Sequence, residues 1–305
     1  MSTAHANFLQ HRDYQSVAIS HFFIDVLNSS RSLVVGILAV SIGLSNAQVG
    51  IALMLYNVGS ALTQPFFGRL ADRYGPRWLI VGGLGWMIFF YSVAALIPPW
   101  PALAALTVAG LGSGAFHPTG TMVASEASQQ HRTQATSIFF MAGQTGLFIG
   151  PLVAGFLLAG FGRSGYLLLP LVALIAFFSA WKWIFNNQVQ LPSSRNAAAA
   201  GHSNRRRSHQ FYRKVVLLGT IILCTGTVSA ATINFTPKLF TEMGYNPAYV
   251  GLLSGLFMLG SAVGGVVGGT WSDRWNGRSV ILLAASTSIL PVFFYIPAAG
   301  LDRFI

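Results

Sequence analysis

The residues best suited to chemistry lie inside an apolar stretch, 17–42, where ionisable side chains are costly and therefore suggest function. At about 100° per helical residue, one face of this stretch carries His21, Asp25, Asn28 and Ser32. His21 and Asp25 are spaced so that their side chains are neighbours on a helix. A carboxylate beside an imidazole can take up and release a proton, which predicts a proton-coupling site. The alternative is a buried ion pair, of Asp25 with His21 or Arg31, that only fixes helix packing.

Two more ionisable residues extend this hypothesis. Arg31 lies about a quarter-turn from the polar face, and its guanidinium could hold Asp25 or donate two hydrogen bonds to a phosphonate or carboxylate substrate. His117, in the stretch 101–124, is expected at the same depth as Asp25, roughly 10–12 Å from one membrane face. At equal depth the two side chains could meet. A histidine before Pro118 could instead satisfy a freed backbone carbonyl.

Uncharged polar residues add weaker candidates for the same cavity. They are Tyr56, Asn57, Gln64, Gln144, Thr145, Thr232 and Asn234. We include Gln144 and Asn234 with the charged residues as candidates for the proton-coupling and substrate cavity. Hydrogen bonding between helices is the alternative for most of this set. The aromatic residues Phe89, Phe90, Tyr91, Phe139 and Phe140 are interpreted as packing or lipid-facing.

The elements that must position these residues are membrane helices. Apolar residues make up 53% of the 305-residue chain and charged residues only 8%, well below the roughly 25% charge of soluble domains. Stretches long enough to span a bilayer lie near 17–42, 47–67, 78–97, 101–124, 136–160, 164–185, 215–236, 248–269 and 279–299. The first is too long and too charged for a cleaved signal peptide. The sequence therefore predicts an all-α integral membrane protein.

The net charge of +11 follows this topology. Every Lys and Arg except Arg31, Arg163, Lys238 and Arg303 falls at one face of the predicted spans. That asymmetry predicts a cytoplasmic N-terminus and argues against nucleic-acid binding. A single cysteine predicts neither a disulfide nor a metal cluster.

A charged segment occurs twice in the chain, at 68–77 and at 269–278. Gly68, Asp72, Arg73 and Arg77 fall on Gly269, Asp273, Arg274 and Arg278 after a shift of 201 positions. Such a repeat predicts a duplicated protein whose halves face the same way, as in transporters that rock around a central site. We interpret 1–185 as a six-helix half, 186–213 as a basic cytoplasmic linker and 214–305 as an incomplete half of three helices. A truncated chain is favoured over a nine-span protein.

The first copy, Gly68-x-Leu70-Ala71-Asp72-Arg73-x-Gly75-x-Arg77, resembles the signature loop between helices two and three of the major facilitator superfamily. The resemblance implies the major facilitator fold, with two pseudo-repeated helical halves. It also implies that both copies belong to a cytoplasmic gate in which the aspartate makes charge contacts. From the residues alone, Gly68 and Gly75 permit a tight turn, and Asp72 can cap the next helix or pair with Arg73 or Arg77.

Two further patterns narrow the resemblance. Gly146, Gly150, Pro151 and Gly155 resemble the superfamily's antiporter motif, with Ala154 where glycine is usual. Their small size predicts close helix packing, and Pro151 predicts a bend. The helix-four arginine common in the family is missing here. Instead, Gly110, Gly112 and Gly114 lead into Phe116-His117-Pro118, which, with the His and Asp of the first helix, is similar to the fosmidomycin-resistance branch of drug exporters.

These observations predict a secondary active transporter that exports a small organic compound or drug by proton-coupled alternating access. Proton-linked uptake of a sugar or organic acid, or a fragment that does not transport, are the alternatives. The expected partners are the substrate, protons and the lipid bilayer, in the cytoplasmic (inner) membrane of a bacterium. We expect no enzyme activity, cofactor or metal, since neither a phosphate-binding loop nor a third metal ligand is evident. The sequence does not define the oligomeric state.

Overall fold

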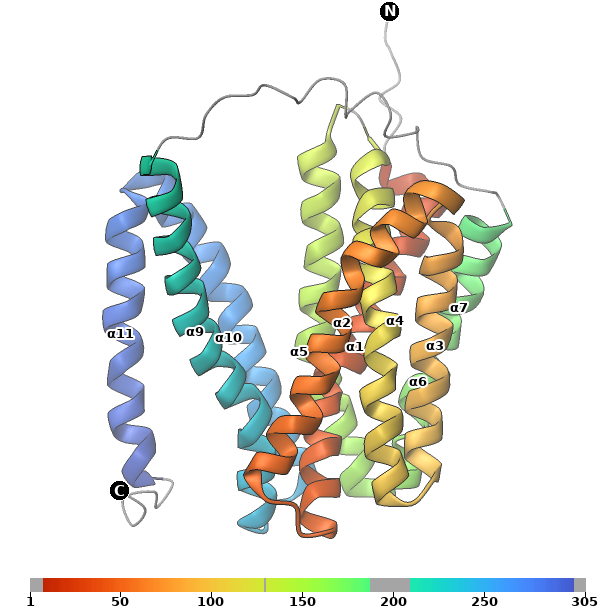
Figure 1. Cartoon of the computed structure of the whole chain (residues 1–305). Coiled ribbons are helices and arrows are strands. Elements are labelled where there is room, and N and C mark those ends of the chain that lie inside the picture. The colour runs from red at the N-terminus through yellow and green to blue at the C-terminus, as the bar shows by residue number, and fades with distance from the viewer. Residues whose placement is uncertain (1–7, 129, 187–208, 299–305) are drawn as a thin grey trace, which may run out of the picture. The chain divides into compact units, whose positions relative to one another are not determined.

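The computed structural model describes residues 8–128, 130–186 and 209–298, and every regular element within them is helical (Figure 1). The elements are η1 (Phe8–Gln10), α1 (Arg12–Ser41), α2 (Asn46–Tyr74), α3 (Arg77–Leu96), α4 (Pro99–Glu126), α5 (Arg132–Gly165), α6 (Leu168–Val172), α7 (Leu174–Ala180), η2 (Trp181–Phe185), α9 (His209–Glu242), α10 (Pro247–Arg274) and α11 (Gly277–Ala298). Backbone contacts divide the chain into two compact units, Met1–Phe257 and Met258–Ile305. The predicted division at a linker over 186–213 stays a prediction, because most of that linker lies outside the described residues.

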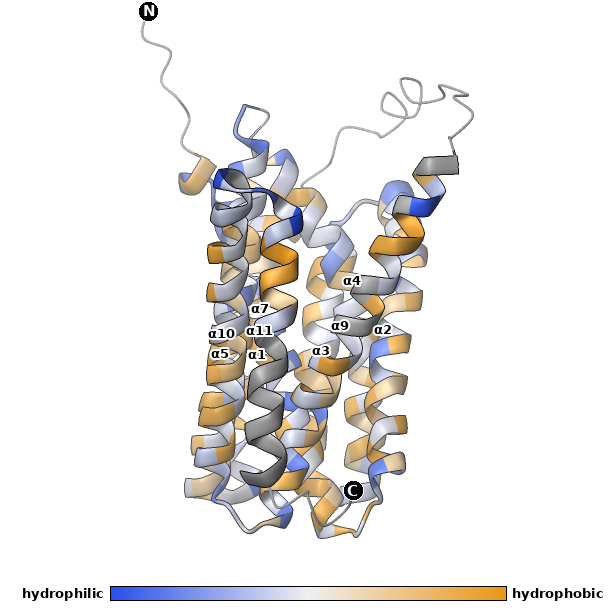
Figure 2. Ribbon diagram, turned by 90° about the vertical axis from the view of Figure 1, so that its left-hand side faces the viewer, coloured by the Kyte–Doolittle hydropathy of each residue, from blue (hydrophilic) through white to orange (hydrophobic). Residues whose placement is uncertain are grey.

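Each of the nine predicted spans coincides with a long helix or, for 164–185, with the consecutive elements α6, α7 and η2. By length and composition, five of these segments in the described chain could cross a membrane: Arg12–Ser41, Arg77–Leu96, Arg132–Gly165, Leu168–Phe185 and Pro247–Ser272. In α2 and α4, glycines and polar side chains dilute the apolar residues. Figure 2 shows hydrophobic residues along the lengths of the helices and hydrophilic ones concentrated towards their ends.

Local sequence signals account for several helix ends. Ser45 begins α2 with a capping box: its hydroxyl accepts a bond from the Gln48 backbone N–H at 3.3 Å, and its own N–H donates to Gln48 Oε1 at 2.9 Å. Gly75 ends the same helix with φ 85°, a conformation that glycine adopts without steric cost. Gly162, at φ 65°, interrupts α5 close to the end of the predicted span.

The glycines of α4 bring three helices close together. A Cβ on Gly110 would lie 2.8 Å from the Tyr56 carbonyl oxygen of α2, and one on Gly114 would lie 2.7 Å from that of Ser60. On the other face of α4, Gly112 packs against Gly83 of α3. A Cβ on Gly83 would lie 2.7 Å from the Gly112 carbonyl oxygen. Any larger residue would push these helices apart, so the glycines fix the position of the following turn of α4.

Helix α1 packs against both α4 and α5, and most of its side chains are buried. Gly146 of α5 lies against the backbone of Phe22, and Gly150 lies against Val26. Ser29 strengthens this packing, because its hydroxyl donates to the carbonyl oxygens of Asp25 at 2.8 Å and Gly146 at 3.4 Å. Gly146 and Gly150 of the predicted antiporter motif therefore set how closely α1 and α5 approach, whereas Gly155 and the Pro151 carbonyl lie against α10.

Helix α9 belongs to the first unit and packs against α1 and α2 through its last turns. The backbone N–H of Lys238 lies 2.9 Å from where a Cβ on Gly36 would be. The ammonium group of Lys238 is buried and donates to Asn46 Oδ1 at 2.8 Å and to Glu242. This polar contact joins α9 to the beginning of α2.

Candidate functional site

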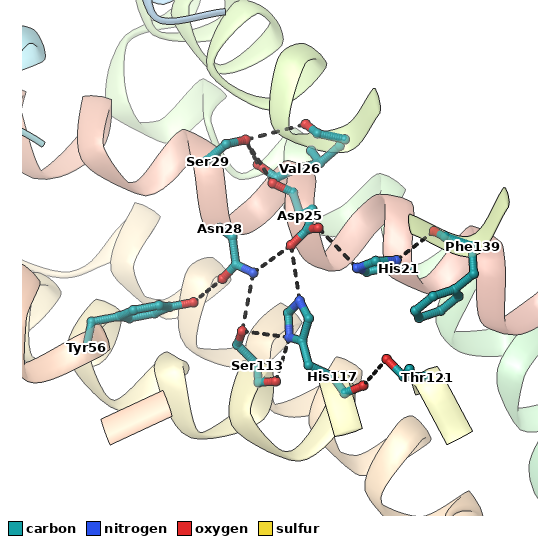
Figure 3. A network of polar contacts seen from close by, with 11 residues as sticks. His21, Asp25, Val26, Asn28, Ser29, Tyr56, Ser113, His117, Thr121 and Phe139 are labelled. Carbon is teal, nitrogen blue, oxygen red and sulfur yellow. Dashed lines mark hydrogen bonds and ion pairs between the residues drawn. The ribbon is translucent and has the colours of Figure 1, made fainter. Parts of the chain in front are cut away.

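A buried carboxylate on α1 is the centre of a polar network inside the first unit (Figure 3). Asp25 Oδ2 lies 3.2 Å from His21 Nε2, and Oδ1 lies 3.5 Å from His117 Nε2. The side chains of His21 and Asp25 are 3% and 10% exposed, whereas that of His117 is 27% exposed. The expected contact between His117 and Asp25 is therefore present, and His117 is the more accessible histidine of the cluster.

Both histidines are oriented by backbone carbonyls. His21 Nδ1 lies 2.8 Å from the Phe139 carbonyl oxygen, and His117 Nδ1 lies 2.9 Å from that of Ser113. Because a carbonyl only accepts, each Nδ1 must carry a hydrogen and each Nε2 is left to face the carboxylate. A proton must then sit between each Nε2 and its oxygen for both contacts to be attractive. Removing one of these protons leaves a nitrogen lone pair facing a carboxylate oxygen.

Asn28 and Ser113 extend the network towards α2 and α4. Asn28 Nδ2 donates to Asp25 Oδ1 at 2.9 Å and to Ser113 Oγ at 3.3 Å. Its Oδ1 accepts a hydrogen bond from Tyr56 Oη. The aromatic ring of Tyr56 lies 3.6 Å from the Arg31 guanidinium carbon, so Arg31 and Asp25 are linked through Tyr56 and Asn28. The ion pair considered between Arg31 and Asp25 is not among the contacts of the described residues.

Two parts of the cluster were not among the sequence candidates. Gly143 faces the network from α5: a Cβ there would lie 2.5 Å from His21 Cε1 and 2.6 Å from Asp25 Oδ2. Gly143 is spaced from Gly146 and Gly150 so that all three lie on one helix face. This spacing is the sequence feature from which its position could have been predicted. Ser113 lies within the glycine-rich segment that precedes His117. The sequence did not indicate that its side chain would contact Asn28 and His117. Phe139 packs as expected, its ring stacking on His21 at 4.1 Å between centroids.

A cavity of about 430 Å³ adjoins the exposed side of His117. It is lined by apolar Pro118, Met122 and Phe140 and by polar Gln64, His117, Thr121 and Ser125. Phe140 is therefore part of the cavity wall, although the sequence favoured packing or lipid contact. The mixture of apolar surface with a few polar groups is typical of small-molecule sites. His117 connects this cavity to the buried carboxylate.

Two of the predicted cavity residues do not join the network. Gln144 is exposed on α5, and its neighbour Gly143 occupies the helix face that meets His21 and Asp25. Asn234 is partly buried on α9, and the hydrogen bonds of the described cluster do not include it. Helical phase explains the case of Gln144, because adjacent residues point about 100° apart.

The repeated charged segment differs from the expected loop. Helix α2 continues through Gly68 to Tyr74, so the turn is confined to Gly75 and Pro76. Asp72 is exposed and does not cap α3, whose N-cap is Pro76 without a side-chain bond. Within the described residues Asp72 also forms no ion pair, and the expected pairing with Arg73 or Arg77 is therefore wrong for this structure. The physical reason is that a continuous helix carries Asp72 away from the turn.

The arginines of this segment contact aromatic rings instead. Arg73 lies 5.2 Å from the Tyr74 ring, and Arg77 lies 5.8 Å from that of Trp78 and 5.6 Å from that of Phe185. These distances allow cation–π attraction of modest strength at exposed sites.

The second copy begins its following helix differently. Asn276 Oδ1 accepts a bond from the Ser279 backbone N–H at 3.0 Å, so Asn276 caps α11. Helix α10 contains Gly269 and Arg274, and Arg278 lies in the first turn of α11. The side chain of Asp273 lies outside what the structure describes.

The three central side chains are also close enough to share a cation. The nearest ligand atoms of His21, Asp25 and His117 lie within 4.8 Å of one another. Each Nε2, however, is already paired with its own carboxylate oxygen, one of which also accepts from Asn28. We therefore interpret the group as a hydrogen-bonded cluster rather than as a set of metal ligands.

Several known proteins are similar to this chain in sequence or in fold. The fosmidomycin resistance protein of Escherichia coli K12 is 25% identical over 94% of this chain and 71% of its own length. The MFS-type transporter YfnC of Bacillus subtilis 168 is 27% identical over 93% of this chain and 70% of its own. The inward-facing, occupied structure of a bacterial homologue of the lysosomal transporter Spinster superposes with a TM-score of 0.70 at 15% identity, covering 91% of this chain and 63% of that one.

The helices and these comparisons define a multi-pass integral membrane protein with the major facilitator fold. Residues 17–305 match the family described as the Major Facilitator Superfamily. The chain belongs to that superfamily, and it spans about 70% of the first two relatives and 63% of the Spinster homologue.

Proposed function

We propose that this chain forms part of a secondary active transporter that exports a small organic compound in exchange for protons by alternating access. The observation that carries the proposal is the position of Asp25 between two histidine Nε2 atoms, each with its Nδ1 held by a carbonyl. This arrangement exchanges protons without dismantling its other hydrogen bonds. Relatives named for resistance to fosmidomycin and to tetracycline support export as the direction.

His117 gives the buried carboxylate a route to solvent. Its side chain is partly exposed and lines the cavity, whereas Asp25 and His21 are buried. In the proposed cycle, substrate enters the cavity while a proton leaves Asp25 through His117. When access switches to the other side, a proton returns to the cluster and the substrate departs. Net charge near Asp25 then alternates, which gives the two access states different stabilities.

We further propose a cytoplasmic N-terminus and a bacterial cytoplasmic membrane. The support is the concentration of Lys and Arg at one end of the spans. In that orientation, the cavity beside His117 lies on the cytoplasmic side of Asp25. The repeated segments at 68–77 and 269–278 then lie at the cytoplasmic surface, where we propose that they contribute to gating. Gly146 and Gly150 are proposed to maintain the close α1–α5 packing that the exchange requires, and Pro151 and Gly155 the close packing of α5 against α10.

Transport in inside-out vesicles tests the proposal. The complete transporter containing this chain is expressed, and fosmidomycin and tetracycline are offered as probes to vesicles made acidic inside. A proton-coupled exporter should accumulate a probe only while the gradient persists. Asp25→Asn should abolish the dependence on the gradient, because asparagine keeps the shape but cannot exchange a proton. Asp13→Asn, the same chemical change in the first turn of α1 and outside the cluster, is the matched control for the coupling measurement.

The outcomes separate the alternatives. Accumulation only in vesicles that are alkaline inside would indicate uptake and contradict export. Undiminished gradient dependence in Asp25→Asn would place proton coupling at another group, and His117→Gln would then be examined first. Each measurement is made with and without EDTA, since gradient dependence that changes with EDTA would point to a bound cation instead of protons.

A further inference from the structure

Arg31 is a buried cation whose hydrogen-bonding capacity is mostly unused. It is 7% exposed, and among the described residues Nε and Nη1 have no hydrogen-bond acceptor. Nη2 alone donates, to Asn57 Oδ1 at 3.2 Å. Guanidinium has five N–H donors and cannot be deprotonated in proteins, so the charge remains. Donors left unpaired in a buried site are costly, and a charged group costs more.

The surroundings of Arg31 contain donors and aromatic faces instead of a carboxylate. The Tyr56 ring lies 3.6 Å from the guanidinium carbon on one side. Tyr91 is fully buried, its Oη also has no partner among the described residues, and it lies close enough to interact electrostatically with Arg31. Tyr166 interacts similarly and shares its hydroxyl with Ser30 Oγ at 2.7 Å. Arg31 and Tyr91 thus leave buried donors unpaired, and the ion pairs of the described residues include no carboxylate beside Arg31.

We propose that Arg31, with Asn57 and Tyr91, binds the oxyanion of the transported compound, whose class is a small organic carboxylate or phosphonate. Both anions accept several hydrogen bonds from a planar guanidinium, which is the strongest pairing available to arginine. Tyr56 holds the guanidinium plane from one side and leaves its remaining donors for the ligand. The inference rests on the proposed transport function and specifies its substrate.

Access to the site comes along α2. Asn57, which holds Nη2, is exposed on this helix, and Gln64, two turns further on, lines the cavity beside His117. Residues at this spacing share a helix face and are separated by about 10 Å. A ligand of that length can place its oxyanion at Arg31 while its other end reaches the cavity. Tyr56 and Asn28 then connect the bound anion to Asp25, so that anion and proton occupancy influence each other.

Ligand binding to the purified chain in detergent tests the assignment without a proton gradient. Benzoate is compared with benzamide, and phenylphosphonate with its diethyl ester, by titration calorimetry. The two pairs separate a carboxylate preference from a phosphonate preference. The parent should bind at least one anion at least tenfold more tightly than its neutral counterpart. Arg31→Gln should remove that preference, and Arg31→Lys should keep part of it, because lysine retains the charge but not the planar donor fork. Arg132→Gln, which removes an exposed arginine paired with Glu126, is the control for net charge.

Several results would overturn the proposal. One is a parent chain without a preference for either anion; another is an unchanged preference in Arg31→Gln. A third is a set of chains in which the parent and Arg31→Lys bind the anion and the neutral compound equally, and Arg31→Gln differs only in unfolding at a lower temperature. That result would identify Arg31 as a structural cation. Asp25→Asn should retain the anion preference. The binding measurement can therefore contradict the anion site while the vesicle measurement supports proton coupling. The opposite pair of results, anion binding without proton coupling, is also distinguishable.

Discussion

The cluster around Asp25 and the charged segment at 68–77 differ in nearly every physical respect. Asp25 is buried, contacts two histidines and an asparagine, and is surrounded by three helices. Asp72 is exposed at the end of α2 and forms no ion pair within the described residues. Both aspartates were functional candidates in the sequence. Their surroundings show that an intramembrane carboxylate must have partners within its own packed unit, whereas a surface carboxylate is stable in water until a partner arrives.

This contrast gives the two aspartates different consequences on mutation. A change in the buried cluster disturbs packing, hydrogen bonding and charge together, because the interior has no water to replace a lost partner. A change in the charged segment should leave folding intact and act only on steps in which that surface meets another part of the protein. Mutations in each of the two regions test this difference.

The largest effect is expected for Gly143→Ala. The new methyl group would lie 2.5 Å from His21 Cε1, so α5 or the cluster must move. Overpacking of this kind costs about 1–3 kcal/mol. Thermal unfolding in detergent should show the loss, and any retained transport should have an altered pH profile. Gly59→Ala is the matched control, since a Cβ there meets nothing within 4 Å. Equal stability of the two variants would contradict the close packing described for α1 and α5.

A smaller effect is expected for Tyr56→Phe. The variant loses the hydrogen bond to Asn28 but keeps the ring beside Arg31. Loss of one buried hydrogen bond costs about 1 kcal/mol, with more if Asn28 is left without a donor. Unfolding temperature measures this cost, and the gradient dependence of transport measures the change at Asp25. Phe89→Leu, at an exposed aromatic position of α3, is a control outside the network. If Tyr56→Phe matches the parent in both measurements, the Tyr56 hydroxyl does not couple Arg31 to the cluster around Asp25.

The smallest effect on stability is expected for Asp72→Asn. Replacing an exposed carboxylate without an ion pair changes the free energy of unfolding by no more than about 0.5 kcal/mol. The unfolding temperature should therefore stay close to that of the parent. Transport rate is measured in the same preparation. A lower rate at unchanged stability would support a gating role that depends on contacts made in another conformation. A large loss of stability would instead show that Asp72 already has a structural partner, and would contradict the contrast drawn here.

Much of the fold could be predicted because helical membrane proteins reveal their elements in hydropathy. Nine apolar stretches predicted the helical segments, and the spacing of His21 and Asp25 predicted that they would be adjacent on a helix. Equal depth, together with the resemblance to a fold in which both helices line the central cavity, predicted that His117 could reach Asp25. The repeated segment led to the superfamily resemblance, and the family match then established membership.

Other features depended on which helix faces meet, and no single-helix pattern contains that information. Gly143 was missed because small residues are common in membrane helices, and its function appears only where α5 meets His21. Gln144, beside it, was selected for its polarity, yet it points away. The segment at 68–77 was expected to be a loop because glycines and charges are typical of turns, but the hydrogen bonds of α2 continue to Tyr74.

The sequence by itself determined the number and placement of the helices, the positions of the ionisable residues within them and the repeat. These follow from hydrophobicity and helical periodicity, which act along one chain segment. The tertiary structure decided that both histidine Nε2 atoms face one carboxylate, that Arg31 lies beside Tyr56 instead of Asp25, and that Asp72 has no ion-pair partner within the described residues. Such contacts depend on the separation and rotation of different helices, which glycine packing between α1, α4 and α5 fixes only in the folded unit.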